Sequence, residues 1–229
     1  FLYPTTGGFP GIELCRHTAT VRRYAELEGD DFVIIGGYES GIDAAFHLAH
    51  QGKQCRILDK AAPWESGGSD PSIVLSTYSF ERMRTLVFKE RVELLPNATV
   101  TSVTQDGEGF SVHTSDGQIL HTPVPPLFAG GFDGSLKLVS DLFDQREDGY
   151  PLLNDQDEST TVPGLFLCGP AVRHDDHIFC FIYKYRQRFA VVAKAIATSM
   201  GLPAEGLETY RQWGMYLDDL SCCGGDCFC

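Results

Sequence analysis

A glycine-rich turn near the start of the sequence has the residue types and spacing that dinucleotide binding requires. It consists of Gly36, Gly37, Tyr38, Glu39, Ser40 and Gly41. Between a strand and a helix, such a turn offers backbone N–H groups and a helix N-terminus to a pyrophosphate. Tyr38 occupies the second glycine position of the pattern G-x-G-x-x-G. Its ring would either narrow the site or swing aside and cover the nicotinamide ribose.

Asp59 follows a second apolar run, residues 56–58, where a ribose-binding acid is expected. A carboxylate at this strand end accepts hydrogen bonds from both ribose hydroxyls and repels a 2′-phosphate. The sequence therefore predicts NADH in preference to NADPH, although Arg56 and Lys60 reduce the discrimination. Two alternatives stay open: the unit binds no nucleotide, or Asp59 is only a solvated strand end.

The eight cysteines are the second group of residues that could bind a metal or carry out redox chemistry. Four of them crowd the C-terminal tail: Cys222, Cys223, Cys227 and Cys229. Four thiolates around a glycine-rich turn suit Zn²⁺ or Cu(I). The same tail could instead be a mobile dithiol that carries electrons, or a segment without a role. The uneven placement is unlike a secreted disulfide scaffold and favours a cytoplasmic redox or metal-handling protein.

The elements needed to position these residues can be read from the apolar pattern. Residues 32–35 form a strand, a helix runs from about Ser40 to Gly52, and residues 56–58 form the next strand. A helix at 79–90 follows, and then alternating runs that we interpret as a β-meander, at 92–95, 99–105, 109–114 and 118–121. A last strand is predicted at 164–170, a long helix at 177–200 and a second helix at 207–220.

Composition describes an ordinary globular chain of 229 residues, 43% hydrophobic and 21% charged. A net charge of −13 argues against nucleic acid or an anionic membrane as the main partner. The longest apolar stretch, residues 178–200, carries four basic residues, too many for a membrane span. Because the chain opens on Phe1 without a methionine or a signal peptide, we expect an N-terminal part to be missing.

Several segments resemble two-dinucleotide flavoproteins, the pyridine nucleotide-disulfide oxidoreductases of the thioredoxin reductase-like group. Residues 33–45 resemble their pyridine-nucleotide domain, and residues 127–132, with Gly130 and Gly131, resemble the segment leading back to the FAD domain. Residues 162–170 resemble their second flavin motif, which here ends Cys168, Gly169 and Pro170, with proline in place of the usual acid. Residues 179–190 are most similar to the bacillithiol disulfide reductase branch.

The resemblance implies an α/β fold: a Rossmann-like parallel sheet with a β-meander (ββα three-layer), plus the C-terminal part of a second, similar FAD-type domain. The implied organisation is a linker at 1–24, an NAD(P)H-binding domain at 25–128, part of an FAD-binding domain at 129–202, and a helix with a cysteine-rich tail at 203–229. The glycine turn that holds the ADP part of FAD has no counterpart here. The fragment alone is therefore expected to be inactive.

The implied function is an FAD-dependent NAD(P)H oxidoreductase that passes hydride through the flavin to a small-molecule or protein disulfide, in a chain that could form a homodimer. Flavin-containing monooxygenase and a non-catalytic nucleotide- or metal-binding module are the alternatives. Cys15 lies where thioredoxin reductases have a redox Cys-x-x-Cys, but Thr18 replaces the second sulfur. Cys15 and the four tail cysteines are therefore weak redox candidates. Residues 174–177 are interpreted as a helix cap near the flavin rather than a metal site.

Overall fold

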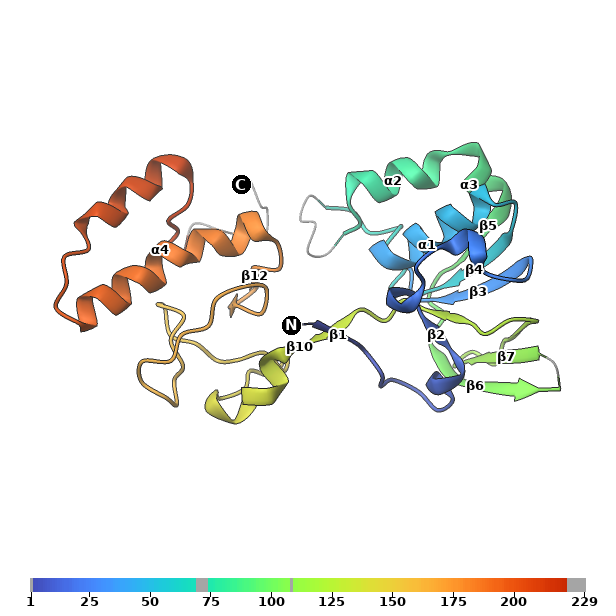
Figure 1. Cartoon of the computed structure of the whole chain (residues 1–229), viewed down its shortest axis with the longest axis horizontal. Coiled ribbons are helices and arrows are strands. Elements are labelled where there is room, and N and C mark those ends of the chain that lie inside the picture. The colour runs from blue at the N-terminus through green and yellow to red at the C-terminus, as the bar shows by residue number, and fades with distance from the viewer. Residues whose placement is uncertain (1, 69–73, 108, 222–229) are drawn as a thin grey trace. The chain divides into compact units, whose positions relative to one another are not determined.

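The computed structural model describes residues 2–68, 74–107 and 109–221 (Figure 1). The chain divides into an N-terminal unit, Leu2–Asp133, and a C-terminal unit that begins at Gly134. Within the described residues, no helix is long and apolar enough to cross a membrane.

The centre of the N-terminal unit is a five-stranded parallel sheet in the order β2-β9-β3-β4-β5. Its strands are β2 (Arg16–His17), β3 (Asp31–Ile35), β4 (Gln54–Leu58), β5 (Val92–Leu95) and β9 (Leu127–Phe128). β3 is covered on both faces, which explains its unbroken apolar run. β2 lies within the segment that we expected to be a linker. β5 was expected in the meander, but it pairs with β4 because the crossover through two helices returns it parallel.

Three helices cover one face of this sheet: α1 (Glu39–His50), α2 (Thr77–Arg84) and α3 (Leu86–Arg91) (Figure 1). Ile42, Ala45 and Leu48 of α1 are buried against the strands. The single helix predicted at 79–90 is two helices, because Thr85 has an extended backbone that ends α2.

The opposite face of the sheet carries the meander, β6 (Val100–Asp106), β7 (Gly109–Thr114) and β8 (Ile119–Thr122), which pair antiparallel. Val103, Val112 and Leu120 pack against Val33 and Leu58 in a second apolar core. The remaining short elements are β1 (Leu2–Pro4), η1 (Ile12–Leu14), η2 (Thr18–Thr20), η3 (Tyr24–Glu26) and β10 (Phe132–Gly134). Sheet, helices and meander make the three layers, and the predicted α/β fold is confirmed.

The C-terminal unit contains η4 (Ser135–Leu142), the hairpin β11 (Arg173–His174) and β12 (His177–Ile178), α4 (Ile182–Ser199) and the 3₁₀ helix η5 (Glu205–Trp213). The strand predicted at 164–170 is absent from this described segment. Only Phe166 forms a bridge, to Glu158, and Gly164 and Gly169 both have positive φ. The predicted cap at 174–177 is also wrong, because these residues form the hairpin and α4 begins at Ile182.

A buried ion cluster connects α4 to the rest of its unit. Asp157 is 0% exposed, and its carboxylate accepts hydrogen bonds from Arg188 Nη2 at 2.8 Å and His174 Nε2 at 2.5 Å. Arg188 also donates to the carbonyls of Leu217 and Asp155, at 2.5 and 2.6 Å. One guanidinium therefore connects three segments that are distant in sequence.

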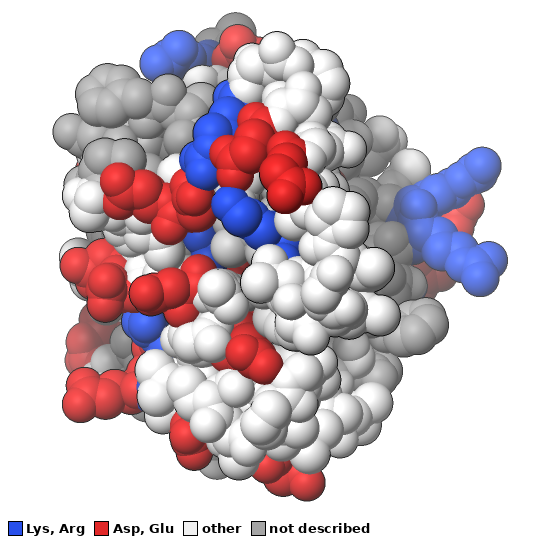
Figure 2. All heavy atoms as spheres, turned by 90° about the vertical axis from the view of Figure 1, so that its left-hand side faces the viewer, with Lys and Arg blue, Asp and Glu red and all other residues white. Residues whose placement is uncertain are grey.

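A second, exposed ion network fastens η5 to α4. Glu208 accepts from Lys194 and Arg211, and Arg211 also donates to Asp218 at 2.6 Å. The hydrogen bond from Arg211 lowers the pKa of Asp218 to about 2. Figure 2 shows a band of basic side chains on this side of the molecule, with acidic side chains beside it.

Candidate functional site

The carboxyl ends of β3, β4 and β9 meet at a cavity of about 540 Å³, within the N-terminal unit. Among its lining residues are Gly36, Tyr38, Glu39, Ser40, Asp59, Gly130 and Gly131. The structure therefore brings together the glycine turn, the acid after β4 and the glycine pair after β9, which the sequence left up to 95 residues apart (36 to 131). In an open parallel sheet, ligands bind at this edge.

Two glycines of the turn are required by close backbone contacts. Gly36 has φ of +103°, and a Cβ atom on it would lie 2.6 Å from the carbonyl oxygen of Ala129. A Cβ atom on Gly41 would lie 1.9 Å from the carbonyl oxygen of Gly36. The first turn of α1 can therefore approach β3 and β9 only without these side chains.

The N-terminus of α1 offers free donors to the cavity. Tyr38 caps the helix without a side-chain hydrogen bond to its backbone. The hydrogen bonds of the turn begin at Gly41 and Ile42, which both donate to the Tyr38 carbonyl. Within the described part of the chain, the N–H groups of Glu39 and Ser40 have no backbone acceptor. Such N–H groups at a helix start form an anion site.

Tyr38 turns toward the segment before α2. Its hydroxyl donates to the Val74 carbonyl at 3.1 Å, and its ring packs against the core beneath α1. The neighbouring Gly37 is covered by Trp64, because a Cβ atom on Gly37 would lie 2.1 Å from Cζ3 of that ring. Tyr38 also lines the cavity, so both predictions for its ring, narrowing the site or covering the nicotinamide ribose, stay open.

Glu39 has a role that the sequence did not reveal. Its carboxylate accepts from Ser76 N at 2.5 Å, Ser76 Oγ at 2.9 Å and Ser79 Oγ at 2.5 Å. Ser76 in turn caps α2, accepting from Ser79 N at 3.2 Å. Glu39 thus connects the start of α1 to the start of α2. The only sequence signal for this contact was Ser76, because serine is a residue type that commonly caps the N-terminus of a helix.

Asp59 both borders the cavity and holds the turn. Oδ2 accepts from Gly37 N at 2.7 Å, and Oδ1 accepts from Ala61 N and Ala62 N at 2.7 and 3.1 Å. A carboxylate has about four acceptor positions, so about one is left for a ribose hydroxyl. The side chain of Asp59 therefore accepts hydrogen bonds from three backbone N–H groups, and this differs from the alternative in which Asp59 is only a solvated strand end.

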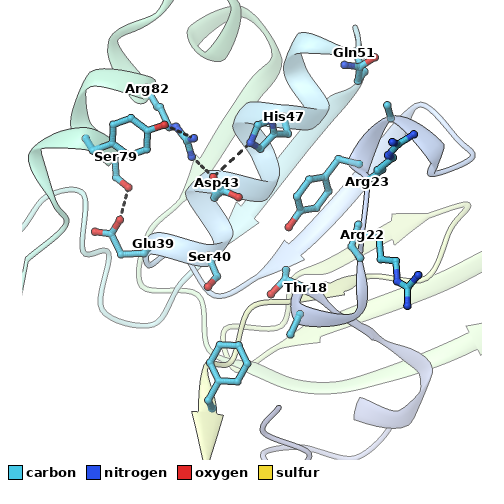
Figure 3. A pocket seen from close by; sticks show the side chains of 16 residues that line it. Thr18, Arg22, Arg23, Glu39, Ser40, Asp43, His47, Gln51, Ser79 and Arg82 are labelled. Carbon is cyan, nitrogen blue, oxygen red and sulfur yellow. Dashed lines mark hydrogen bonds and ion pairs between the residues drawn. The ribbon is translucent and has the colours of Figure 1, made fainter. Parts of the chain in front are cut away.

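A second cavity, of about 780 Å³, lies over the outward face of α1, and we call it the α1 groove (Figure 3). Its floor is Ser40, Asp43, His47 and Gln51, and Glu39 and Ser40 line both cavities. Asp43 forms an ion pair with Arg82 of α2, and His47 Nε2 lies 3.6 Å from Asp43 Oδ1. The sequence analysis did not predict that Asp43 and His47 line a cavity. The only signal was their i,i+4 spacing, which places both side chains on the same face of a helix.

Tyr24 forms the opposite wall of the α1 groove. Its ring stacks on His47 with centroids 5.7 Å apart and planes 6° apart. Burial, and then the charge of Asp43, raise the pKa of Tyr24 to about 12. The phenol is therefore a neutral hydrogen-bond donor across the physiological range.

Three cysteines within the described residues, Cys15, Cys55 and Cys168, lie in surroundings that raise the pKa of the thiol. Cys15 packs in the apolar core beneath the meander, where burial raises its pKa to about 12. Since the thiolate is the nucleophile, a raised pKa leaves less of the Cys15 thiol in its reactive form, and the role of Cys15 stays a prediction. Burial and the charge of Asp157 raise the pKa of Cys168 as well. No metal-binding cluster occurs in the described residues, and the four tail cysteines lie outside them.

The residues of the second flavin motif lie in the C-terminal unit. Gly169 has φ of +117°, and the Pro170 carbonyl accepts from Arg173 at 2.9 Å. Proline brings no side-chain acceptor, so the ribitol contact of the usual acid has no equivalent at this position.

A parallel sheet whose carboxyl edge carries a glycine turn, free helix donors and an acid defines a dinucleotide-binding unit of the Rossmann type. A family model described as pyridine nucleotide-disulphide oxidoreductase matches residues 1–169. The chain belongs to this family, which confirms the resemblance found in the sequence.

Solved structures show the same fold. Bacillithiol disulfide reductase Bdr (YpdA) from Bacillus cereus matches with a TM-score of 0.65 and 22% identity, over 86% of this chain and 59% of that one. Thioredoxin reductase from T. acidophilum matches with a TM-score of 0.61 and 16% identity, over 87% and 63%. A Cu(II) complex of the HOCl-induced flavoprotein disulfide reductase RclA from Escherichia coli matches with a TM-score of 0.60 and 16% identity, over 85% and 42%. The chain thus spans about half the length of these proteins.

Proposed function

We propose that this chain is the pyridine-nucleotide half of an FAD-dependent oxidoreductase. In this function NAD(P)H gives a hydride to the flavin, and the two electrons then reduce a disulfide to two thiols. The observation that carries the proposal is the pair of free N–H groups of Glu39 and Ser40, at a cavity that Asp59 also lines. Within the described residues, Cys15, Cys55 and Cys168 form no disulfide, which supports a reducing compartment such as the cytoplasm.

The described residues fit the nicotinamide cofactor better than the flavin. The N–H groups of Glu39 and Ser40 would hold the pyrophosphate, and Asp59 a ribose hydroxyl. Both cavities border the first turn of α1, so a dinucleotide can lie across it with one half in each. For FAD, the resemblance points separately to Gly130 and Gly131 in the N-terminal unit and to the segment ending at Pro170 in the C-terminal unit. FAD, when bound, supplies the two-electron chemistry.

Binding of NADH to the chain tests the nucleotide site without flavin. The chain has two tryptophans, and Trp64 packs against Gly37 of the turn. Energy transfer from Trp64 to bound NADH is therefore expected in the wild type and in Trp213→Phe, and the transfer should be reduced in Trp64→Phe. A folded chain to which neither NADH nor NADPH binds by calorimetry would refute the site.

The Asp59 carboxylate should set the choice between NADH and NADPH. We expect Asp59→Asn to lower the preference for NADH about tenfold, because it removes a charge that repels the 2′-phosphate while retaining one acceptor. Asp59→Ala should weaken both nucleotides and lower the melting temperature, since Gly37 N then loses its acceptor. The measurement is the ratio of the two dissociation constants. An unchanged ratio in both variants would show that Asp59 only holds the turn.

A further inference from the structure

His17 connects the walls of the two cavities. It is the last residue of β2, and its ring forms hydrogen bonds with Gly131, in the glycine pair after β9, and with Ala19 of the short helix η2. Gly131 lines the cavity of about 540 Å³, whereas Thr18 and Ala19 line the α1 groove (Figure 3). One side chain therefore fixes segments that belong to both cavities.

The hydrogen bonds of the His17 ring require one neutral tautomer. Nδ1 lies 3.1 Å from Ala19 N, which is a donor, so Nδ1 carries the lone pair and accepts. In the neutral ring the proton is then on Nε2, which lies 2.9 Å from the Gly131 carbonyl oxygen and donates to it. Only the neutral ring with its proton on Nε2 satisfies both contacts.

Gly131 depends on backbone contacts for its position. It has φ of +77°, and even a Cβ atom at this residue would have no neighbouring atom within 4 Å. Glycine loses more conformational freedom on folding than any other residue, so hydrogen bonds have to hold such a position. Among the described residues, the Gly131 carbonyl accepts from His17 Nε2 and, at 3.2 Å, from Thr5 N. His17 thus supplies one of the two donors that hold this carbonyl beside the cavity.

Aromatic packing also holds the ring of His17. The rings of Phe128 and Phe132 both meet it in an edge-to-face arrangement, with centroids 5.6 Å from its own. Phe132 lines the α1 groove, and Phe128 lines the other cavity. The substitution His17→Phe would retain aromatic contacts of this kind and lose both hydrogen bonds, so an experiment can separate the two contributions.

Protonation of His17 would break this arrangement. A proton on Nδ1 turns the acceptor into a donor that faces the N–H group of Ala19. Among the elements packed against His17, β2 carries the charged residue Arg16 and β10 carries Asp133, whereas β9 and η2 carry none. Because neighbouring residues of a strand point to opposite faces, Arg16 points away from the face of His17, and Asp133 points away from the face of Phe132. The charge of the His17 ring itself therefore decides whether the Ala19 contact forms.

We infer that His17 is a positioning residue for the dinucleotide, and that its neutral form holds Gly131 and η2 where NAD(P)H contacts them. The inference rests on the proposed function, since that function assigns the dinucleotide to the same two cavities. Histidine is the side chain that changes its charge between about pH 5 and pH 8. Acidification over this range should therefore weaken nucleotide binding through His17.

Calorimetric titration with NADH at about pH 8 and about pH 6 tests the role of His17. At the higher pH, His17→Phe should bind NADH about 5- to 30-fold more weakly than the wild type, because two hydrogen bonds are lost. His17→Gln should stay within about threefold of the wild type, since its amide N–H group can still donate to the Gly131 carbonyl. The wild type should bind about three- to tenfold more weakly at the lower pH, and His17→Gln should lose this dependence.

His47→Gln and His121→Gln are the matched controls. His47 lines the α1 groove, whereas His121 lies on the meander and lines neither of the two cavities. Both variants should retain the dependence on pH that the wild type shows. A nitrogen NMR spectrum of the histidine rings should show the proton of His17 on Nε2 in the free chain at the higher pH. Circular dichroism verifies that each variant is folded.

Equal NADH affinity in the wild type and in His17→Phe would overturn the inference. So would a wild-type affinity that is the same at both pH values, a dependence on pH that His17→Gln retains or that His47→Gln abolishes, or a His17 ring with its proton on Nδ1. A wild type that binds neither NADH nor NADPH at either pH would refute the proposed function and the inference together, whereas the other results would refute the inference alone.

Discussion

Replacing Arg188 by Met is expected to destabilise the C-terminal unit by about 3–5 kcal/mol, because it leaves a buried carboxylate without its main partner. Asp157 is fully buried, and the guanidinium of Arg188 contacts both of its oxygens. The same guanidinium also donates to two backbone carbonyls, which would lose their donor. Arg188→Met should therefore be among the most damaging single substitutions in α4.

Hydrogen exchange resolved by segment is the appropriate measurement, because the chain has two units. Amides of α4 should exchange about 100- to 5,000-fold faster in Arg188→Met, while those of β3 stay unchanged. Arg186→Met is the control on the same helix, since Arg186 is exposed and should leave α4 exchange unaltered. The double variant Asp157→Asn with Arg188→Met should recover part of the protection, because it removes the unpaired charge. Unaltered α4 exchange in Arg188→Met would show that the ion pair contributes little.

Replacing Gly41 by Ala should weaken NADH binding about 10- to 100-fold, the equivalent of about 1–3 kcal/mol of steric strain. The added Cβ atom would meet the Gly36 carbonyl oxygen at 1.9 Å, so the first turn of α1 has to move away from β3. That movement displaces the N–H groups of Glu39 and Ser40. Alanine otherwise favours helices, so without this contact the substitution would be neutral or stabilising.

Gly67→Ala is the matched control for Gly41→Ala. Gly67 lies in the same unit, has an ordinary φ, and has no neighbouring atom within 4 Å of the position that a Cβ atom would occupy. Calorimetric titration with NADH should show wild-type affinity for Gly67→Ala and reduced affinity for Gly41→Ala. Equal affinity in the two variants would mean that the turn tolerates a side chain at Gly41 and that the phosphate site lies elsewhere.

The sequence by itself determined the features that depend on local pattern. The apolar run of β3, the turn from Gly36 to Gly41 and the helix after it were predicted because strand, turn and helix signals lie within a few residues of one another. Residues 127–132, 162–170 and 179–190, further along the chain, also carried the family resemblance. The position of Asp59 after β4 followed from the same pattern, since a strand places its last residue at the sheet edge.

The tertiary structure decided what each of these residues contacts. Asp59 is held by Gly37 N, and Glu39 by Ser76 and Ser79, because the connection after β4 folds back over the turn. The α1 groove arises where α2 and the segment around Tyr24 flank α1. No local sequence pattern predicts that these two segments lie beside α1. The pKa of the Cys15 thiol is raised first by burial, a property of packing, and then by the charge of Glu13.

Long-range pairing explains the other differences between prediction and structure. Arg188 meets Asp157 across 31 positions, and a charge pair at that separation has no periodic signal. β5 joined the parallel sheet because the crossover before it fixed its direction, although its residues alone suit a meander equally well. The sequence thus determined which residues could bind a dinucleotide, whereas the folding of distant segments onto one another decided which of their atoms are still free to do so.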